Sequence, residues 1–376
     1  MRNQEGESVQ SKNLEQLPGA ATFNGAVAFQ VLEAAFARAL EKSPESFHES
    51  FYTFAGQSVH VRVVGRALAK NIIPSFAHLQ THGPAPDAPR LIIDLWDQHE
   101  TGIGCQVRFA NDNSGWTDLI AKSPDSRFVG QQQPRTFACL DRFTNCIVGS
   151  IAWREPIGVY ERAKPLSRLL LEWHNDQNLQ VIHAGLLAWK NYGILLVGKS
   201  GSGKSTSTLA CVCAGLTYLG EDYVGLQRLP DGSFVGHSLY NSVFLDSSLL
   251  TRFSNLTPYV IKGRPDEKKS AIILSQVFPD RLRRVVPIRA LLIPRVANTP
   301  TSKISPASKG QALLALGPSS LLQLASRRRP QSFTLLAQLI DQIPCYWLES
   351  GYDLDAIPRC VKELLAEAVF SESGHC

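Results

Sequence analysis

Residues 193–206 have the sequence GILLVGKSGSGKST, and this stretch decides how the fold is interpreted. The apolar run ILLV is long enough for one buried strand, and the residues after it match the pattern G-x-x-x-x-G-K-S. Gly198, Gly201 and Gly203 allow the backbone to turn so that successive N–H groups face one point. A helix starting near Lys204 would direct its positive end to the same point. The stretch therefore predicts a strand, a phosphate-binding loop and a helix.

Two side chains in this pattern carry the chemistry of nucleotide binding. The Lys204 ammonium can reach the β- and γ-phosphates of a triphosphate, and the Ser205 hydroxyl can ligate Mg²⁺. We therefore expect ATP and Mg²⁺ as cofactors; the alternative is a glycine-rich turn in which the lysine and serine are incidental. The residues expected to bind the nucleotide at the loop are Gly198, Lys199, Ser200, Gly201, Ser202, Gly203, Lys204, Ser205 and Thr206.

An acidic pair follows the loop after a short interval. A predicted helix at 205–214 and a predicted strand at 216–219 precede Glu221 and Asp222, which come seventeen residues after Lys204. A right-handed crossover makes this strand parallel to the one before the loop, so both carboxyl ends share one edge of the sheet. One carboxylate can then help to hold Mg²⁺ while the other accepts a proton from an attacking hydroxyl. The alternative is a pair of surface acids after a strand.

Together these residues resemble the HPr kinase/phosphorylase-like serine kinases, a family that shares its core with the ATP-dependent phosphoenolpyruvate carboxykinases. The matching features are His183-Ala184 before the loop, the loop itself, the spacing to Glu221-Asp222, and the segments 237–242 and 291–295. The resemblance implies an α/β fold, with a mixed sheet around the phosphate-binding loop. It extends to a bacterial branch that includes peptide-tailoring kinases.

The resemblance also implies roles for the polar residues near the loop. Glu221 aligns with the general base of the family and Asp222 with the acid nearer the metal, so Ser205 and Asp222 are the expected metal ligands. The family usually has aspartate at the first position, and the longer glutamate leaves either acid as the candidate base. His183 aligns with a histidine near the phosphates that could steady the transferring group; the alternative is a structural histidine at a strand.

Two further cations are candidates for contacting the phosphates. Lys268 lies in the charged segment 262–269. The alternative is that the charged side chains of this segment are exposed to solvent and bind nothing. Arg295 follows an apolar strand, a suitable place for a phosphate clamp.

The rest of the chain indicates two domains after a disordered lead at 1–20. Residues 21–155 are expected to form a mostly β domain, with a helix near the start and a possible role in substrate recognition. Residues 156–376 are expected to form the kinase-like domain. The individual helices predicted are 26–41, 157–175, 309–326, 332–342 and 354–369, and the individual strands in the first domain include 58–64 and 91–96.

Composition excludes several classes of protein. Of 376 residues, 44% are hydrophobic and 19% charged, which suits a globular protein with a core, and the net charge is +5. No aromatic-rich basic stripe indicates nucleic-acid binding, and no apolar run reaches membrane-spanning length. The N-terminus is polar and contains acidic residues, unlike a signal peptide, and the eight cysteines show no C-x-x-C spacing. We expect a cytoplasmic protein with reduced thiols and neither nucleic-acid nor membrane partners.

The sequence therefore favours an enzyme, a Mg-ATP-dependent kinase that transfers the γ-phosphoryl group to a serine or another hydroxyl. The acceptor could belong to a peptide, a protein or a small molecule, and homo-oligomers are possible as in the family. One alternative is a non-catalytic ATP-binding sensor, suggested by Glu221 in place of aspartate. Another is a carboxykinase-like enzyme acting on a small acid, which shares the fold.

Overall fold

The computed structural model describes residues 23–84, 87, 90–109, 119–152, 158–265, 267–323 and 329–373. The lead expected at 1–20 and the last residues of the helix expected at 309–326 lie outside this part. The chain divides into two compact units, which are described separately. The first comprises Met1–Glu49, Val61–Ala69 and Leu91–Arg154, and the second comprises Ser50–His60, Lys70–Arg90 and Glu155–Cys376. The domain boundary expected near residue 155 stays a prediction.

The first unit is built from antiparallel and parallel strands covered by one long helix. In this unit the strand order is β4-β8-β7-β6-β5, with β4 and β8 parallel and the other neighbours antiparallel. The strands are β4 (Leu91–Asp97), β5 (Leu119–Lys122), β6 (Phe128–Gln133), β7 (Thr136–Asp141) and β8 (Cys146–Ile151), and a short helix α3 (Gln98–Thr101) follows β4. Strands β1 (Phe47–Phe54) and β2 (Gln57–Val64) and helix α2 (Arg66–Ile72) are divided between the units.

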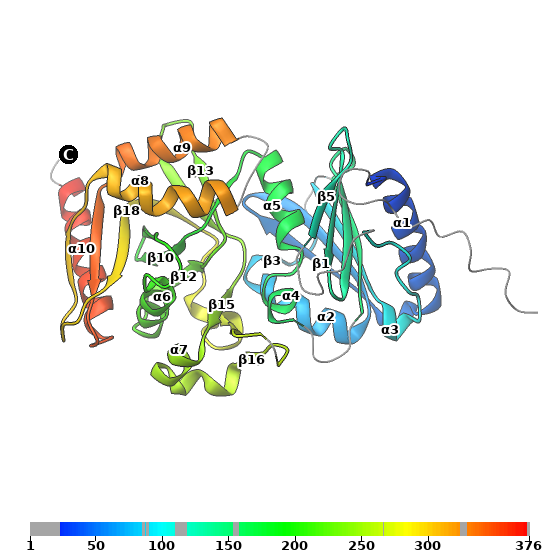
Figure 1. Cartoon of the computed structure of the whole chain (residues 1–376), viewed down its shortest axis with the longest axis horizontal. Coiled ribbons are helices and arrows are strands. Elements are labelled where there is room, and N and C mark those ends of the chain that lie inside the picture. Colours follow the sequence, from blue (N-terminus) through cyan, green and yellow to red (C-terminus); the bar gives the residue numbers. More distant parts are fainter. Residues whose placement is uncertain are drawn as a thin grey trace, which may run out of the picture. The chain divides into compact units, whose positions relative to one another are not determined.

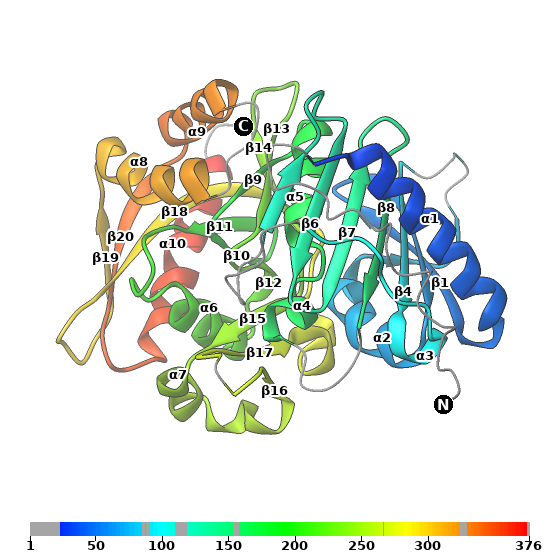
Figure 2. The same ribbon diagram turned by 45° about the vertical axis from the view of Figure 1, so that its right-hand side comes forward.

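Helix α1 (Gly25–Lys42) confirms the helix expected at 26–41. The Asn24 side chain caps its start by accepting a hydrogen bond from the Val27 N–H at 3.2 Å. Apolar residues at helical spacing, such as Phe29, Leu32 and Phe36, are buried and pack on the sheet. Figure 2 shows α1 lying across β6, β7 and β8.

The second unit has a nine-stranded mixed sheet of order β12-β10-β11-β18-β14-β13-β9, with β20 beside β18 and β19 beside β20. The strands are β9 (Gln180–Ile182), β10 (Gly185–Trp189), β11 (Tyr192–Leu196), β12 (Thr217–Gly220), β13 (Val224–Arg228), β14 (Phe234–Ser238), β18 (Val285–Val296), β19 (Lys303–Pro306) and β20 (Cys345–Ser350). A smaller sheet contains β15 (Ser242–Leu245), β17 (Ser270–Ile273) and β16 (Ile261–Lys262). The predicted α/β architecture with a mixed sheet is thus present.

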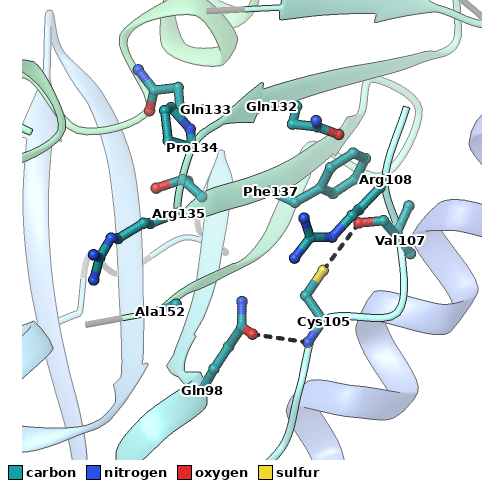
Figure 3. A pocket seen from close by; sticks show the side chains of 11 residues that line it. Gln98, Cys105, Val107, Arg108, Gln132, Gln133, Pro134, Arg135, Phe137 and Ala152 are labelled. Carbon is teal, nitrogen blue, oxygen red and sulfur yellow. Dashed lines mark hydrogen bonds between the residues drawn. The ribbon is translucent and has the colours of Figure 1, made fainter. Parts of the chain in front are cut away.

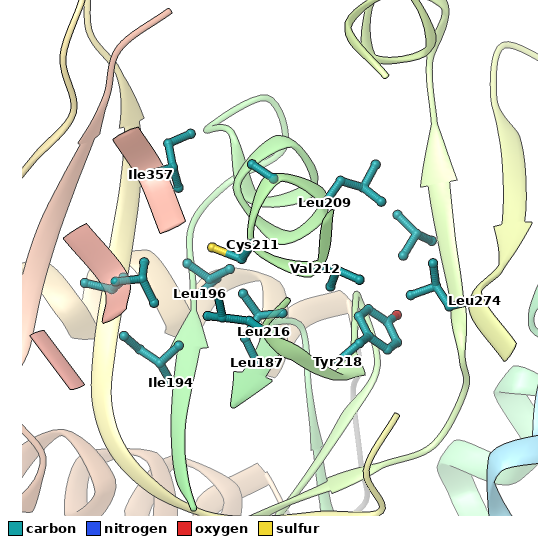
Figure 4. Close-up of a cluster of buried hydrophobic side chains, with 14 of the residues drawn as sticks. Leu187, Ile194, Leu196, Leu209, Cys211, Val212, Leu216, Tyr218, Leu274 and Ile357 are labelled. Atoms are coloured by element: carbon teal, nitrogen blue, oxygen red, sulfur yellow. The ribbon is translucent and has the colours of Figure 1, made fainter. Parts of the chain in front are cut away.

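Helices cover both faces of the large sheet, as Figure 1 shows for α6 on one face and for α8 and α9 on the other. Figure 4 shows the core beneath α6, where Leu196, Leu209, Val212 and Tyr218 are fully buried. The larger helices of the unit are α5 (Ser167–Asp176), α6 (Lys204–Cys213), α8 (Lys309–Pro318), α9 (Arg329–Gln342) and α10 (Ala356–Ser373), and the shorter ones are α4 (Val159–Ala163) and α7 (Ser247–Arg252).

The single helix expected at 157–175 is wrong, because two helices, α4 and α5, occupy this segment. Pro165 lies between them and lacks a backbone N–H, and a proline also disfavours helical geometry at the residue before it. Leu166 adopts a left-handed backbone with φ of 55°. The break leaves Lys164 at the end of α4, where it becomes part of the site described below.

The chain also contains seven free cysteines among the described residues. Cys211 is buried in α6 and Cys213 is half-buried, as expected for thiols that pack against a core. Within the described residues, no helix combines the length and the apolar character needed to cross a membrane.

Candidate active site at the edge of the large sheet

The glycine-rich loop connects β11 to α6 as the sequence predicts. Gly198, Gly201 and Gly203 have φ values of 151°, 77° and 102°, a region that side chains other than glycine rarely adopt. A Cβ atom at Gly198 would also lie 2.8 Å from the Ser202 hydroxyl oxygen. The loop therefore needs glycine at these positions, and α6 begins at Lys204 directly after it.

The loop borders a cavity in the second unit with a volume of about 780 Å³. Most of the expected loop residues line it, whereas Gly198 and Ser202 do not. The lining residues are His183, Lys199, Ser200, Gly201, Gly203, Lys204, Ser205, Thr206, Asp222, Phe244, Asp246, Ser248, Leu249, Arg252, Lys269, Val296, Leu314, Ala315, Pro318 and Ser319.

Lys204 is held by its own loop. Its ammonium donates to the backbone oxygen of Gly198 at 2.6 Å and to that of Lys199 at 3.2 Å. Burial lowers the pKa of Lys204, while the charges of Asp222 and Glu221 act to raise it. The side chain thus occupies the concave side of the loop, where the phosphate oxygens of a nucleotide could replace the two carbonyl oxygens as acceptors.

The acidic pair lies at the same edge of the sheet as the loop. Strand β12 is antiparallel to β10, and β10 is antiparallel to β11, so β12 is parallel to β11 with one strand between them. This confirms the expected parallel direction and places Glu221 and Asp222 beyond the carboxyl end of β12. Asp222 turns the chain with a left-handed φ of 64°. Such a conformation is uncommon outside glycine but is tolerated by aspartate.

The two acids occupy different surroundings. Glu221 is 1% exposed and does not line the cavity, whereas Asp222 does. The Glu221 Oε2 atom accepts a hydrogen bond from the Phe244 N–H at 3.3 Å, and its Oε1 atom has no partner among the described residues. The Ser205 hydroxyl lies close enough to Glu221 to affect its pKa. Glu221 is therefore beneath the loop, and Asp222 faces the open space.

The pKa values of the pair move in opposite directions. Burial raises the pKa of Glu221, and the negative charge of Asp222 raises it further. Burial also acts to raise the pKa of Asp222, but the charges of Lys164 and His183 outweigh it and lower that pKa. Asp222 is consequently the acid that keeps its negative charge.

Lys164 is the residue at this site that the sequence did not reveal. Its side chain is 2% exposed, and its ammonium donates to the Asp222 Oδ2 atom at 3.0 Å and to the Glu221 backbone oxygen at 2.9 Å. The same ammonium lies 4.5 Å from the centre of the Phe244 ring and 5.2 Å from that of Tyr223. No local pattern could have identified it, since 57 residues separate it from Glu221.

His183 follows β9 and also reaches the acidic pair. Its Nε2 atom lies 3.6 Å from the Asp222 Oδ1 atom, and its backbone N–H donates to the Ser320 hydroxyl at 3.0 Å. Burial lowers the pKa of His183, opposed by Asp222. His183 therefore lines the cavity, and its backbone hydrogen bond gives it a structural contact as well.

The remaining expected cations are not at the cavity. Lys268 is exposed and does not line it, but the adjacent Lys269 does and lies 5.8 Å from the centre of the Phe244 ring. Arg295 forms an ion pair with Glu349 and stacks 4.6 Å from the centre of the Trp347 ring. Strands β18 and β20 pair in parallel, and this pairing places Arg295 beside Glu349. Arg295 therefore contacts Glu349 and Trp347 and does not line the cavity.

A second, smaller cavity lies in the first unit and has a different character. Figure 3 shows Gln98, Cys105 and Arg108 at its wall, where the Cys105 N–H donates to the Gln98 side chain at 3.2 Å. Its volume of about 60 Å³ is far below the range of about 300–1,000 Å³ typical of small-molecule sites. None of the residues expected to bind a nucleotide lines it.

The donor set of the large cavity fits Mg²⁺ and a triphosphate. Mg²⁺ prefers oxygen ligands and usually binds through one or two carboxylates together with substrate phosphates. The Ser205 hydroxyl and the Asp222 carboxylate line the cavity and supply such oxygens, and the buried Glu221 Oε1 atom without a partner lies next to Ser205. Within the part of the chain described, no group of three or more His, Cys, Asp or Glu residues could hold a metal alone.

Comparisons with known proteins show a distant structural likeness. No family model matches the chain, and no curated protein matches its sequence. Among solved structures it is similar to the Hpr(Ser) kinase/phosphatase from Coxiella burnetii, with 13% sequence identity and a TM-score of 0.32. The match covers 52% of this chain and 96% of that chain. The similarity is distant, and at this TM-score it says nothing about function.

Proposed function

We propose that this chain is a Mg-ATP-dependent kinase that transfers the γ-phosphoryl group of ATP to a hydroxyl group. The observation that carries the proposal is the convergence of Lys204, Ser205 and Asp222 on one cavity, with Glu221 beneath Ser205. A loop lysine, a metal-ligating hydroxyl and a carboxylate facing the transferred group are the parts that phosphoryl transfer requires.

In this proposal the residues of the chain have distinct tasks. Lys204 exchanges its contacts with the loop carbonyls for phosphate oxygens, and Ser205 and Glu221 hold Mg²⁺. The bound ion neutralises negative charge on the phosphates. Asp222 orients the acceptor hydroxyl and takes its proton as the hydroxyl oxygen bonds to the γ-phosphorus and the bond to the departing ADP breaks.

This assignment exchanges the roles that the resemblance implied for the two acids. Asp222 lines the cavity and keeps its charge beside Lys164, which suits a residue that contacts the acceptor. Glu221 lies next to Ser205 and has a carboxylate oxygen without a partner among the described residues, which suits a metal ligand. His183, near Asp222, would steady the transferring group.

The proposal includes an acceptor hydroxyl on a peptide, a protein or a small molecule, and a cytoplasmic location. Assays with these three kinds of acceptor distinguish among them. Two results would contradict the kinase assignment. One is the formation of phosphoenolpyruvate from a small acid, and the other is ATP binding without turnover.

The test measures ATP binding and phosphoryl transfer on the full chain with Mg²⁺. Lys204→Met should abolish detectable ATP binding, because the ammonium that contacts the phosphates is lost. Asp222→Asn should bind ATP normally but lose about 100-fold or more in transfer rate, within the usual range for a general base. Glu221→Gln should raise the Mg²⁺ concentration needed for half-maximal rate.

Two outcomes would contradict the proposal. Transfer that survives in Asp222→Asn and disappears in Glu221→Gln at saturating Mg²⁺ would restore the role of Glu221 as base. ATP binding that is unchanged in Lys204→Met would show that the loop is not the phosphate site.

A further inference from the structure

The cavity has an apolar side that phosphate chemistry does not explain. Val296 is 71% exposed and Leu314 is 76% exposed, and both line the cavity together with Ala315 and Pro318. Val296 ends β18, and the other three residues lie on α8. Large apolar side chains with this exposure, gathered at one wall of a cavity, indicate a surface that packs against a ligand.

The order of strands fixes where this apolar side lies. At the edge that carries the loop, the strands run in the order β12, β10, β11, β18, and β11 is parallel to β18. The loop after β11 therefore lies between Asp222, beyond β12, and Val296, at the end of β18. A Cβ atom at Gly203 would lie 3.9 Å from Val296, so the apolar side borders the loop directly.

The opposite side of the cavity cannot offer a comparable apolar surface. Phe244 is 4% exposed, and the Lys164 ammonium lies against its ring. Leu249 is 5% exposed and packs in the core. The side next to Asp222 is therefore charged and already packed. A ligand that extends from the loop in both directions meets charge at one end and exposed apolar side chains at the other.

We propose that Val296, Leu314 and Pro318 form the surface that binds the base of the nucleotide. This inference rests on the proposed function, because it takes the triphosphate to lie along the loop with its γ-phosphate toward Asp222. Three strand spacings of about 4.8 Å separate β12 from β18, about 14 Å in all. The base of a nucleotide bound in this direction lies over the end of β18, where flat apolar rings pack on apolar side chains.

The experiment compares two ligands that share phosphates but differ in the base. Isothermal titration calorimetry with Mg²⁺ gives the dissociation constants of ATP and of inorganic tripolyphosphate for the full chain. Leu314→Gln and Val296→Thr should each weaken ATP binding about fivefold through lost apolar contact, and leave tripolyphosphate binding unchanged. Two matched controls, Phe333→Gln on α9 and Val285→Thr at the other end of β18, change exposed apolar residues away from the cavity and should alter neither constant.

The outcomes separate this inference from the proposed function. A wild-type chain that binds tripolyphosphate as tightly as ATP would overturn the base site and leave the phosphate site intact. Equal weakening of both ligands by Leu314→Gln, or no weakening of either, would also overturn the base site. A chain that binds neither ligand would overturn the proposed function itself. Thermal unfolding of each variant checks that the fold is retained.

Discussion

At the scale of single residues, Lys164 places a buried positive charge beside the negative charge of Asp222. Its ammonium has one carboxylate partner, one carbonyl partner and two aromatic rings around it. A buried charge is costly unless such partners compensate it. The pair with Asp222 holds that carboxylate at the cavity in a left-handed backbone position.

If Asp222 is the base as proposed, Lys164→Met should lower the rate of phosphoryl transfer about 100-fold while ATP affinity stays nearly constant, because this carboxylate loses its positioning partner. Breaking the buried pair should also destabilise the fold by about 3 kcal/mol. Single-turnover rates and ATP titrations measure the two effects separately. Lys164→Arg keeps the charge and should recover part of the rate; a variant that loses ATP affinity and rate equally would contradict this role.

The adjacent residues Lys268 and Lys269 differ in their position relative to the cavity. Lys269 lines the cavity and Lys268 does not. Lys269→Met should weaken ATP binding several-fold, since a cation near the phosphates is removed, whereas Lys268→Met should bind ATP like the wild type. Calorimetric titration of both variants gives the comparison, and a larger effect from Lys268→Met would show that the loop is arranged differently in the complex.

At the scale of elements, helix α7 forms one wall of the cavity and depends on its cap. The Asp246 side chain accepts from the Leu249 N–H at 2.8 Å and from the Ser248 hydroxyl at 2.7 Å. An N-cap of this kind satisfies a backbone donor that the helix cannot. Because Ser248, Leu249 and Arg252 of α7 line the cavity, the cap also fixes that wall.

Asp246→Ala should lower the free energy of unfolding by about 1 kcal/mol, because the cap is lost. Asp246→Asn keeps a capping oxygen and should restore most of this stability while it removes the charge near Lys269. Urea unfolding at neutral pH compares the two variants. If both variants were equally destabilised, the charge rather than the cap would be the stabilising feature.

At the scale of the whole chain, the second unit contains two buried histidines, His174 and His237, and a half-buried one, His78. His78 bonds to Ser238 at 2.6 Å and accepts from the Asn241 side chain at 3.1 Å, while the His174 Nδ1 atom has no partner among the described residues. Burial lowers the pKa of His78 and of His174 to about 3, and that of His237 to about 4. These rings are neutral in the folded chain at any pH near neutrality.

Acid should therefore destabilise the second unit. In the unfolded chain a histidine has a pKa of about 6.5, so below this pH the unfolded chain binds protons that the folded chain does not. The free energy of unfolding therefore falls as the pH drops from 6.5 toward 3. Each such histidine contributes about 1.4 kcal/mol per pH unit in this window. His174→Phe should reduce the slope of unfolding free energy between pH 6 and pH 4.5 by about that amount, measured by urea titration.

The control for this prediction is His48→Gln, because His48 is exposed. It should leave the slope unchanged. An unaltered slope in His174→Phe would mean that His174 is protonated in the folded chain.

Local patterns were sufficient for much of the fold. Helical spacing located α1, and β-rich runs located β2 and β4, because each element buries a face that its own residues define. The break between α4 and α5 was missed, since the apolar spacing continues across Pro165.

By itself the sequence determined the loop, its lysine and serine, and the acidic pair, because all of them lie within 25 residues on one strand-loop-helix-strand unit. Only the tertiary structure decided which acid faces the cavity, that Lys164 pairs with that acid, and that Lys269 lines the cavity while Arg295 pairs with Glu349. Those contacts join residues far apart in the chain. They depend on which strands pair across the sheet, and no local pattern of residues specifies that pairing.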